Sequence, residues 1–461
     1  SHQKYWQMLP VNPTGKGQGY SPYSAFSSTA GNTILISPEL LEKESLLSAS
    51  DLQKFKLPLT GKVDFNSAEQ IRNELFEIAW HRYKSGDFFE LKTAFDEFKL
   101  KEFDWLKDFA FYTVLKEMHA GKPWYDWPEE HKLYNAASLS ALSGEIEDKL
   151  EKVKWLQCIF NMQLLELKNY CHSLNIELIG DIPFYVSYDS ADVWANRKFF
   201  ALDVDGKMVA VAGVPPDFFS EDGQLWGMPV FNWKALKEDN FSWWMKRLKR
   251  NKDLFDLLRL DHFRAFSSYW EVPSEAKTAK SGKWEKGPGD AFFHAAKETL
   301  NSLPFIAEDL GDIDKAVYDL RDHFNLAGMK VLQFAFGSEM PHSPHIPHNF
   351  TRNFFVYTGT HDNNTVKGWY RSETEKVKKE IDMYLNTAQS EETIAESMSR
   401  LAYSSVANTI ILPLQDLLNL DEESRMNTPS SIENNWTWQL QQNELKGYEK
   451  LREWVSIYNR E

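Results

Sequence analysis

With 461 residues, 42% of them hydrophobic and 26% charged, the chain has the composition of a globular protein with a large core. Its formal net charge of −15 argues against nucleic acid and anionic membranes as partners, because an acidic surface repels phosphate. No apolar run approaches the ~20 residues that span a bilayer, and the first residues lack the basic and apolar regions of a signal peptide.

Short apolar runs that end in polar residues recur along the chain. They span 5–11, 176–182, 254–260, 305–310, 329–336, 353–358 and 409–414. These runs are apolar on both faces and are flanked by Gly, Pro, Asn or Asp, which is typical of buried parallel strands. Helical patterns at 150–174 and 313–324 lie between them, so the order of elements predicts an α/β fold.

The connection between the first two runs is too long for a single helix. Asn66 or Ser67 can cap a helix whose apolar face holds Ile71, Leu75, Ile78 and Ala79. We therefore predict a helical insertion over 40–165, after the second barrel strand. A second insertion is expected over 183–250, with a hairpin signal at Asp205 and Gly206.

The two cysteines, Cys158 and Cys171, both lie in the predicted helix 150–174. They form neither a disulfide framework nor a zinc-binding spacing. Two idle or buried thiols are the simplest interpretation, and they favour a reducing compartment, which predicts a cytoplasmic protein.

Seven strands and their helices predict a (β/α)8 TIM barrel, as one catalytic domain over 1–461. The barrel needs eight strands, and the first run begins at residue 5 with no helix before it, so we expect that the first βα unit is missing from this chain. Catalytic groups of such barrels sit at the C-terminal ends of strands. Asp181, Asp261, Glu308 and Asp362 each lie near or just past the end of an apolar run.

Carboxylates on separate strand ends suggest glycosyl transfer, in which one carboxyl group protonates the leaving oxygen and another attacks the anomeric carbon. Arg259 stands two residues before Asp261, so both project to the same side of a strand. Structural alternatives remain open for each segment. Arg259 and Asp261 can be an ordinary ion pair, Asp309 after Glu308 can cap a helix, and a His–Asp pair at 361–362 can be a loop contact.

Together these segments resemble glycoside hydrolase family 77, the amylomaltases or disproportionating enzymes. The similar stretches run from Tyr5 to Trp438 and carry several motifs. They are 5–7 (Tyr-Trp-Gln), 19–23 (Gly-Tyr-Ser-Pro-Tyr), 180–186, 190–194, 213–217, 223–227, 258–264, 306–311, 357–363, 425–429 and 435–436. The resemblance implies a 4-α-glucanotransferase.

The resemblance also implies roles for individual residues. Asp261 resembles the nucleophile, Glu308 the general acid/base and Asp362 the transition-state stabiliser. Substrate-binding residues are expected at Tyr23, Ser21, Asp181, Arg259, His361, Trp226, Gln224 and Asn349.

The segment 213–229 resembles the active-site loop of the family, which would shield a covalent intermediate from water and so favour transfer over hydrolysis. It has Met228 where Asn is common in the family, a difference for which we expect only a small change in loop packing. The expected partners are maltooligosaccharides and other α-1,4-glucans, with glucose as an acceptor, and no cofactor is implied.

Three other interpretations remain open. An α-glucan hydrolase would use the same barrel and the same carboxylates, and a glucan-binding protein would need no acid and nucleophile pair. A metal site is conceivable at His342, His345 and His348, but Pro344 and Pro347 oppose the helix that this spacing would require. We therefore expect no metal.

Overall fold

The computed structural model describes residues 2–56, 60–216, 221–431, 433–441 and 448–460. All seven predicted parallel strands are present in these residues. They are β1 (Tyr5–Gln7), β2 (Glu177–Ile182), β5 (Leu257–Leu260), β8 (Phe305–Ala307), β9 (Gly328–Val331), β10 (Phe354–Tyr357) and β11 (Thr409–Ile411).

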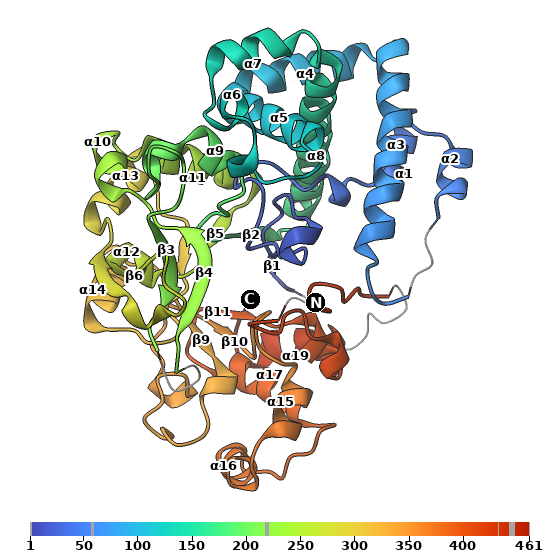
Figure 1. Ribbon diagram of the computed structural model, residues 1–461. Helices are drawn as coiled ribbons and strands as arrows, with labels where there is room; N and C mark the ends of the chain where they lie inside the picture. The colour runs from blue at the N-terminus through green and yellow to red at the C-terminus, as the bar shows by residue number, and fades with distance from the viewer. Residues whose placement is uncertain (1, 57–59, 217–220, 432, 442–447, 461) are drawn as a thin grey trace.

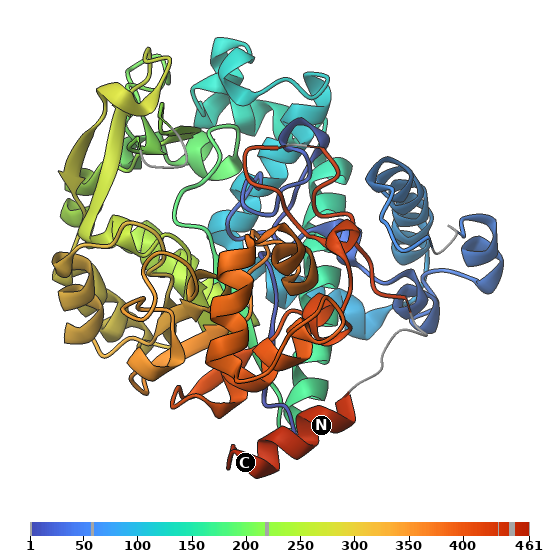
Figure 2. The same ribbon diagram turned by 90° about the horizontal axis from the view of Figure 1, so that it is seen from below.

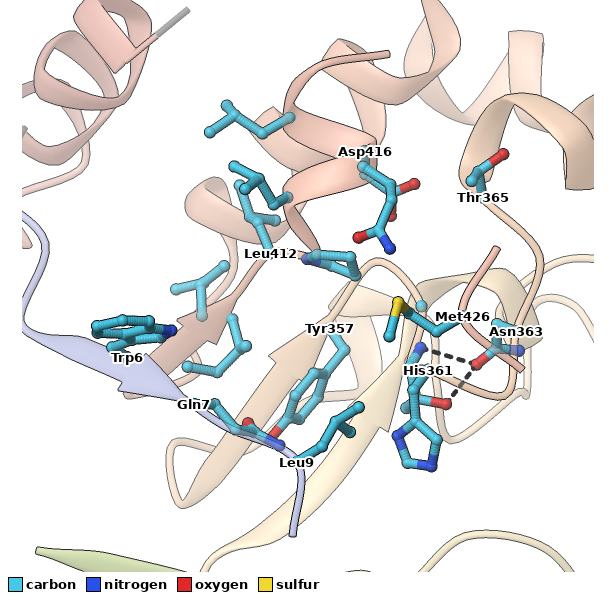
Figure 3. Close-up of a pocket in the computed structure, with 18 of the residues that line it drawn as sticks. Trp6, Gln7, Leu9, Tyr357, His361, Asn363, Thr365, Leu412, Asp416 and Met426 are labelled. Atoms are coloured by element: carbon cyan, nitrogen blue, oxygen red, sulfur yellow. Dashed lines mark hydrogen bonds between the residues drawn. The ribbon is translucent and has the colours of Figure 1, made fainter. Parts of the chain in front are cut away.

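These strands follow one another in chain order around a barrel. β1, β2, β5 and β8 form one parallel ladder, and β9, β10 and β11 form a second. A parallel bridge between Ile306 and Ala327 joins the two ladders, and the Ala307 N–H donates to the Ala327 carbonyl at 2.8 Å. A cavity of about 360 Å³ lies between the edge strands β1 and β11 (Figure 3).

Several strands end earlier than the apolar runs predict, for local reasons. The run 5–11 leaves the sheet after Gln7, and Pro10 within it has no N–H to donate. After Val331 the chain turns into a 3-10 helix at Leu332–Phe334. The run 409–414 ends at Ile411, since Pro413 caps the next helix, α18 (Leu414–Leu417).

Helices fill the connection between β1 and β2, and they gather on one side of the barrel (Figure 1). They are α1 (Pro38–Lys43), α2 (Ala49–Lys54), α3 (Phe65–Ser85), α4 (Phe89–Lys101), α5 (Phe103–Met118), α6 (Glu129–Lys132), α7 (Ala136–Ser143) and α8 (Glu147–Ser173). α8 corresponds to the predicted helix 150–174 and leads directly into β2. Both cysteines are buried in it and unpaired.

The predicted cap of α3 was wrong. Asp64 is the N-cap, and its side chain accepts the Ser67 N–H at 3.2 Å, so Asn66 and Ser67 are already inside the helix. The sequence offers several polar residues close together, and the local pattern alone does not choose between them. Leu75 and Ala79 of the predicted apolar face are buried, and the partly buried Ile71 and Ile78 pack against the same core.

A separate antiparallel sheet stands beside the barrel in the order β4-β3-β6-β7. Its strands are β3 (Ala210–Val214), β4 (Gln224–Pro229), β6 (Ser268–Pro273) and β7 (Lys283–Lys286). The predicted turn at Asp205 and Gly206 is present, with Gly206 at φ +82° between the bridged residues Leu202 and Met208. The segment 213–229 forms the β3–β4 hairpin, of which residues 217–220 lie outside the described residues.

The remaining helices flank the strands that follow. They are α9 (Ala191–Ala195), α10 (Trp233–Glu238), α11 (Ser242–Leu254), α12 (Arg264–Ser267), α13 (Asp290–Leu300), α14 (Lys315–His323), α15 (Val366–Ser372), α16 (Glu375–Leu385), α17 (Ile394–Ser404) and α19 (Tyr448–Ile457). α14 corresponds to the predicted helix 313–324. The two chain ends lie close together at α19 (Figure 2). Among the helices described, none is long and apolar enough to cross a membrane.

Candidate active site

The interior of the barrel changes from apolar to polar along the strands. Ile179 and Phe355 pack in the apolar part of the interior. Two residues further along the same strands and on the same side, since side chains alternate in a strand, lie Asp181 and Tyr357. The ring of Tyr357 still belongs to the apolar cluster, whereas its hydroxyl begins the polar layer. The Tyr357 hydroxyl donates to Gln7 at 2.8 Å. The polar layer therefore lies toward the C-terminal ends of the strands, where barrel enzymes carry their sites.

Asp261 and Glu308 lie side by side just beyond this layer. Leu260 of β5 pairs with Ala307 of β8, and each carboxylate is the next residue of its chain segment. The Glu308 N–H donates to the Leu260 carbonyl at 3.1 Å. Two residues far apart in sequence thus meet at one mouth of the barrel, at the ends of adjacent strands whose backbones lie about 4.8 Å apart.

One buried arginine joins two of the predicted site carboxylates. Nη1 of Arg259 lies 2.9 Å from both carboxylate oxygens of Asp181 and 2.9 Å from Oδ1 of Asp261. The side chains of Arg259 and Asp181 are 5% and 0% exposed, whereas Asp261 is 27% exposed. Burial opposes the charge of Arg259, but the two carboxylates outweigh it and raise the pKa of the guanidinium. Arg259 therefore stays charged and holds Asp261 at the open end.

Glu308 has the opposite electrostatic character. Burial, reinforced by the neighbouring charge of Asp261, raises the pKa of Glu308 to about 8, although Arg259 acts against the rise. The N–H groups of His262 and Leu310 donate to its two carboxyl oxygens at 2.8 and 3.2 Å. His262 has φ +50°, in the left-handed region that few residues other than Gly adopt. At neutral pH the site thus holds a protonated Glu308 beside Asp261.

A third group of predicted residues adjoins Asp181. The Tyr23 hydroxyl donates to Asp181 at 2.7 Å, and the Tyr23 ring stacks on His361 with the centroids 4.8 Å apart. Nε2 of His361 lies 3.5 Å from Oδ2 of Asp362. Oδ1 of Asp362 accepts a hydrogen bond from the Asn427 amide at 2.6 Å. Tyr23, Asp181, His361 and Asp362 therefore form one connected set.

Trp226, on β4 of the 213–229 hairpin, reaches the site through His262. The two rings are 4.9 Å apart and nearly perpendicular. The Trp226 indole N–H donates to the side chain of Gln224 at 3.2 Å, which orients the ring. The hairpin thus contacts the residue that follows Asp261.

Two other predicted binding residues have mainly local contacts. The Ser21 hydroxyl accepts the Tyr23 N–H at 3.3 Å, so Ser21 supports Tyr23. The Asn349 amide donates to the carbonyls of Pro341 and Ser343 at 2.9 and 3.0 Å. Among the described contacts, none joins Asn349 to the carboxylates, and its substrate-binding role stays a prediction.

Asn427 and Trp436 belong to the site but were not selected from the sequence as site residues. Asn427 contacts the carboxylate of Asp362, and the Trp436 ring lies 5.9 Å from Tyr23 and 5.8 Å from His361. Both stand in motifs that carry the family resemblance, at 425–429 and 435–436. The motifs are therefore the signal by which these two residues could have been found.

The histidines considered for a metal have other contacts. His345 accepts the Val331 N–H at 3.2 Å, and His348 contacts Tyr384 and the Pro341 carbonyl. In the described part of the chain, no three His, Cys, Asp or Glu residues are grouped as metal ligands.

The fold and the site define a class of protein: a barrel with a protonated carboxyl group beside a second, arginine-paired carboxyl group acts on glycosidic bonds. Comparison with known sequences narrows the class. The chain matches the model of the 4-alpha-glucanotransferase family over residues 1–444. It is 41% identical over 464 residues to a 4-alpha-glucanotransferase of Streptococcus pneumoniae, a match that covers 99% of this chain and 90% of that protein. A 4-alpha-glucanotransferase of Thermus thermophilus is 40% identical over 448 residues, covering 96% and 88%.

Solved structures agree with the sequence comparison. The amylomaltase from Streptococcus agalactiae in complex with acarbose superposes with a TM-score of 0.94 at 37% identity, covering 99% of this chain and 92% of that one. The amylomaltase from Corynebacterium glutamicum has a TM-score of 0.74 at 16% identity, covering 99% and 70%, and supports the fold alone. The chain belongs to the 4-alpha-glucanotransferase family, with the barrel fold that the sequence predicted.

Proposed function

We propose that the protein transfers α-1,4-glucan segments from a donor maltooligosaccharide to the 4-hydroxyl of an acceptor by a retaining double displacement. The observation that carries the proposal is the pair of Asp261 and Glu308 on adjacent strands. Arg259 is paired with Asp261, while burial keeps Glu308 protonated. A nucleophile and an acid on neighbouring strand ends are the pair that a retaining mechanism requires.

In the first half of the reaction, a carboxylate oxygen of Asp261 attacks the anomeric carbon of the donor. The glycosidic C–O bond breaks, and the proton of Glu308 passes to the leaving oxygen, which departs as a free 4-hydroxyl. The product is a β-linked glucosyl ester of Asp261, and Glu308 is left as a carboxylate. The leaving segment then makes room for an acceptor.

In the second half, the 4-hydroxyl of an acceptor attacks the same carbon from the opposite side. The carboxylate of Glu308 takes the hydroxyl proton, the ester bond to Asp261 breaks, and a new α-1,4 bond forms. Both groups return to their starting protonation states. Two inversions at one carbon retain the configuration of the donor.

The remaining polar residues act on the sugar at the cleavage point. Asp362 and the neighbouring His361 would hold hydroxyl groups of the distorted donor ring, whose hydrogen bonds strengthen in the transition state. The Asp181–Arg259 pair and Tyr23, which stacks on His361, would contact the same sugar. Because these groups are already linked to one another, little reorganisation is needed when charge develops on the ring.

Transfer exceeds hydrolysis if the acceptor is held while water is excluded. Trp226 supports this, since its indole beside His262 offers a stacking surface next to the carboxylates. Glucose and maltooligosaccharides are the acceptors that such a site would bind. The two unpaired thiols fit a reducing compartment, so the cytoplasm is the proposed location.

The experiment is incubation of the purified protein with maltotriose alone, with products followed by chromatography. The expected products are glucose and a series of maltooligosaccharides longer than maltotriose. Glucose and maltose alone, without longer chains, would identify a hydrolase and contradict the proposal. Asp261→Asn and Glu308→Gln should each abolish this series while the circular dichroism spectrum is unchanged, and full activity in either variant would refute the assigned roles.

A further inference from the structure

Asp416 on α18 is a buried carboxylate that the mechanism above does not use. Asp416 as a whole is only 3% exposed. Oδ2 accepts the Thr358 hydroxyl at 2.5 Å, and Oδ1 accepts the Val366 N–H at 2.8 Å. Burial raises the pKa of Asp416 to about 6, the mark of a costly position for a charge. A buried carboxylate with two such partners calls for an explanation.

Its two partners are the two ends of one segment, 358–366. Thr358 directly follows β10, and Val366 is the first residue of α15. His361 and Asp362 lie between them. One carboxylate therefore fixes the separation of both ends of the segment that presents these side chains to the site. Figure 3 shows Asp416 and Thr365 toward one end of the pocket and His361 toward the other.

The tip of the segment is held by the same C-terminal stretch of the chain. Arg425 donates to the Asp362 carbonyl, and Asn427 donates to the Asp362 carboxylate, both at 2.6 Å. Gln415, the neighbour of Asp416, donates to the Ser424 carbonyl at 3.1 Å and so links α18 to this stretch. Residues 415–427 thus hold segment 358–366 both at its two ends and at its tip, where Asp362 lies.

We propose that Asp416 is a positioning residue for the transfer reaction, which holds segment 358–366 so that Asp362 meets the hydroxyl groups of the donor sugar. The inference rests on the proposed role of Asp362 as transition-state stabiliser. Asp416 acts through Asp362 and needs no contact with substrate. Its effect can be large, because a misplacement of about 1 Å costs on the order of 100-fold in rate.

The test compares Asp416→Ala and Asp416→Asn with the wild type in maltotriose disproportionation. We expect kcat of Asp416→Ala to fall about 100-fold with KM nearly unchanged. Asp416→Asn keeps an oxygen for the Val366 N–H and should recover part of the loss. The matched control is Asp189→Asn. Asp189 accepts bonds from Tyr112, Lys116 and Trp124 outside the site, so this variant should lower stability but not kcat.

A second donor, α-maltotriosyl fluoride, separates the stabiliser from the acid, because fluoride leaves without a proton. In the first turnover, before the acceptor must be activated, Glu308→Gln should keep the rate of the fluoride burst, whereas Asp416→Ala should lose it. Added to Asp362→Asn, Asp416→Ala should cause no further loss. The inference would be overturned if Asp416→Ala lowered kcat equally in the wild type and in Asp362→Asn. It would also be overturned if the loss of kcat only matched the fraction of unfolded protein in the variant. Full activity in Asp362→Asn would instead overturn the proposed role of Asp362, and the inference with it.

Discussion

Replacing Glu308 by glutamine should stabilise the protein at alkaline pH while it destroys the activity. The pKa of Glu308 is raised from 4.5 to about 8, chiefly by burial. Such a rise corresponds to about 5 kcal/mol against ionisation in the folded state. The mouth of the barrel is partly open to solvent, so we expect about 2–4 kcal/mol to be measurable. The glutamine side chain of the variant carries no charge and still offers one oxygen to the N–H of His262 or Leu310.

The direction in which stability changes with pH follows from the protonation of Glu308 in the folded and unfolded states. Below pH 4.5 the carboxyl group is neutral both folded and unfolded, so Glu308 causes no loss of stability. Between pH 4.5 and about 8 the unfolded chain releases the proton and the folded chain retains it, which lowers the stability of the wild type as the pH rises. The advantage of Glu308→Gln should therefore be small at pH 4.5 and largest at pH 8.

Thermal unfolding of both proteins at pH 4.5 and pH 8 measures this difference. For a chain of this length the unfolding entropy is about 1 kcal/mol per degree, so the Tm gap between variant and wild type should widen by about 2–4 °C. In parallel, the transfer rate of the wild type should fall above pH 8, where Glu308 loses its proton. A gap of equal size at both pH values would refute a protonated Glu308 in the folded protein.

Three further predictions follow from contacts of the site and its surroundings. Arg259→Lys keeps the charge but replaces the guanidinium, whose Nη1 contacts both Asp181 and Asp261, with an ammonium of different reach and shape. The kcat for maltotriose should therefore drop about 100-fold, and an unchanged kcat would contradict the role of Arg259. Trp226→Ala removes the stacking surface beside His262, so the ratio of glucose release to formation of longer glucans should rise. An unchanged product ratio would exclude Trp226 from acceptor binding. Asp309→Ala removes the buried partner of Arg321 and should lower the free energy of unfolding by about 3–5 kcal/mol in urea denaturation, and a loss below about 1 kcal/mol would contradict it.

The strands were predictable because their signal is local. Each of the seven apolar runs coincides with a strand that forms there, since a strand buried on both faces needs a continuous apolar stretch. The ends were less predictable. The residues 332–334 continue the run of the strand before them, yet they form a 3-10 helix, and this depends on what packs against them. The cap of α3 was predicted at Asn66 or Ser67 but lies at Asp64, because several neighbouring polar residues fit a cap equally well.

The principal carboxylates were recognisable for a similar reason, since Asp261 and Glu308 follow apolar strands directly and stand in motifs of the family. The physical causes of their protonation and pairing could not be predicted from these local patterns. The shared contact of Arg259 with Asp181 and Asp261, and the burial that raises the pKa of Glu308, arise only when strands far apart in sequence become neighbours.

The sequence by itself determined the α/β class, the seven strands and the carboxylates at their ends, because periodicity and motif are properties of consecutive residues. Only the tertiary structure shows why Glu308, the acid that the family resemblance implied, carries the proton, and which distant residues hold Asp362 in place. Protonation depends on desolvation and on charges a few ångströms away, and Asn427 and Asp416 reach segment 358–366 from a distant part of the chain. Such contacts follow from packing, which no short stretch of sequence contains.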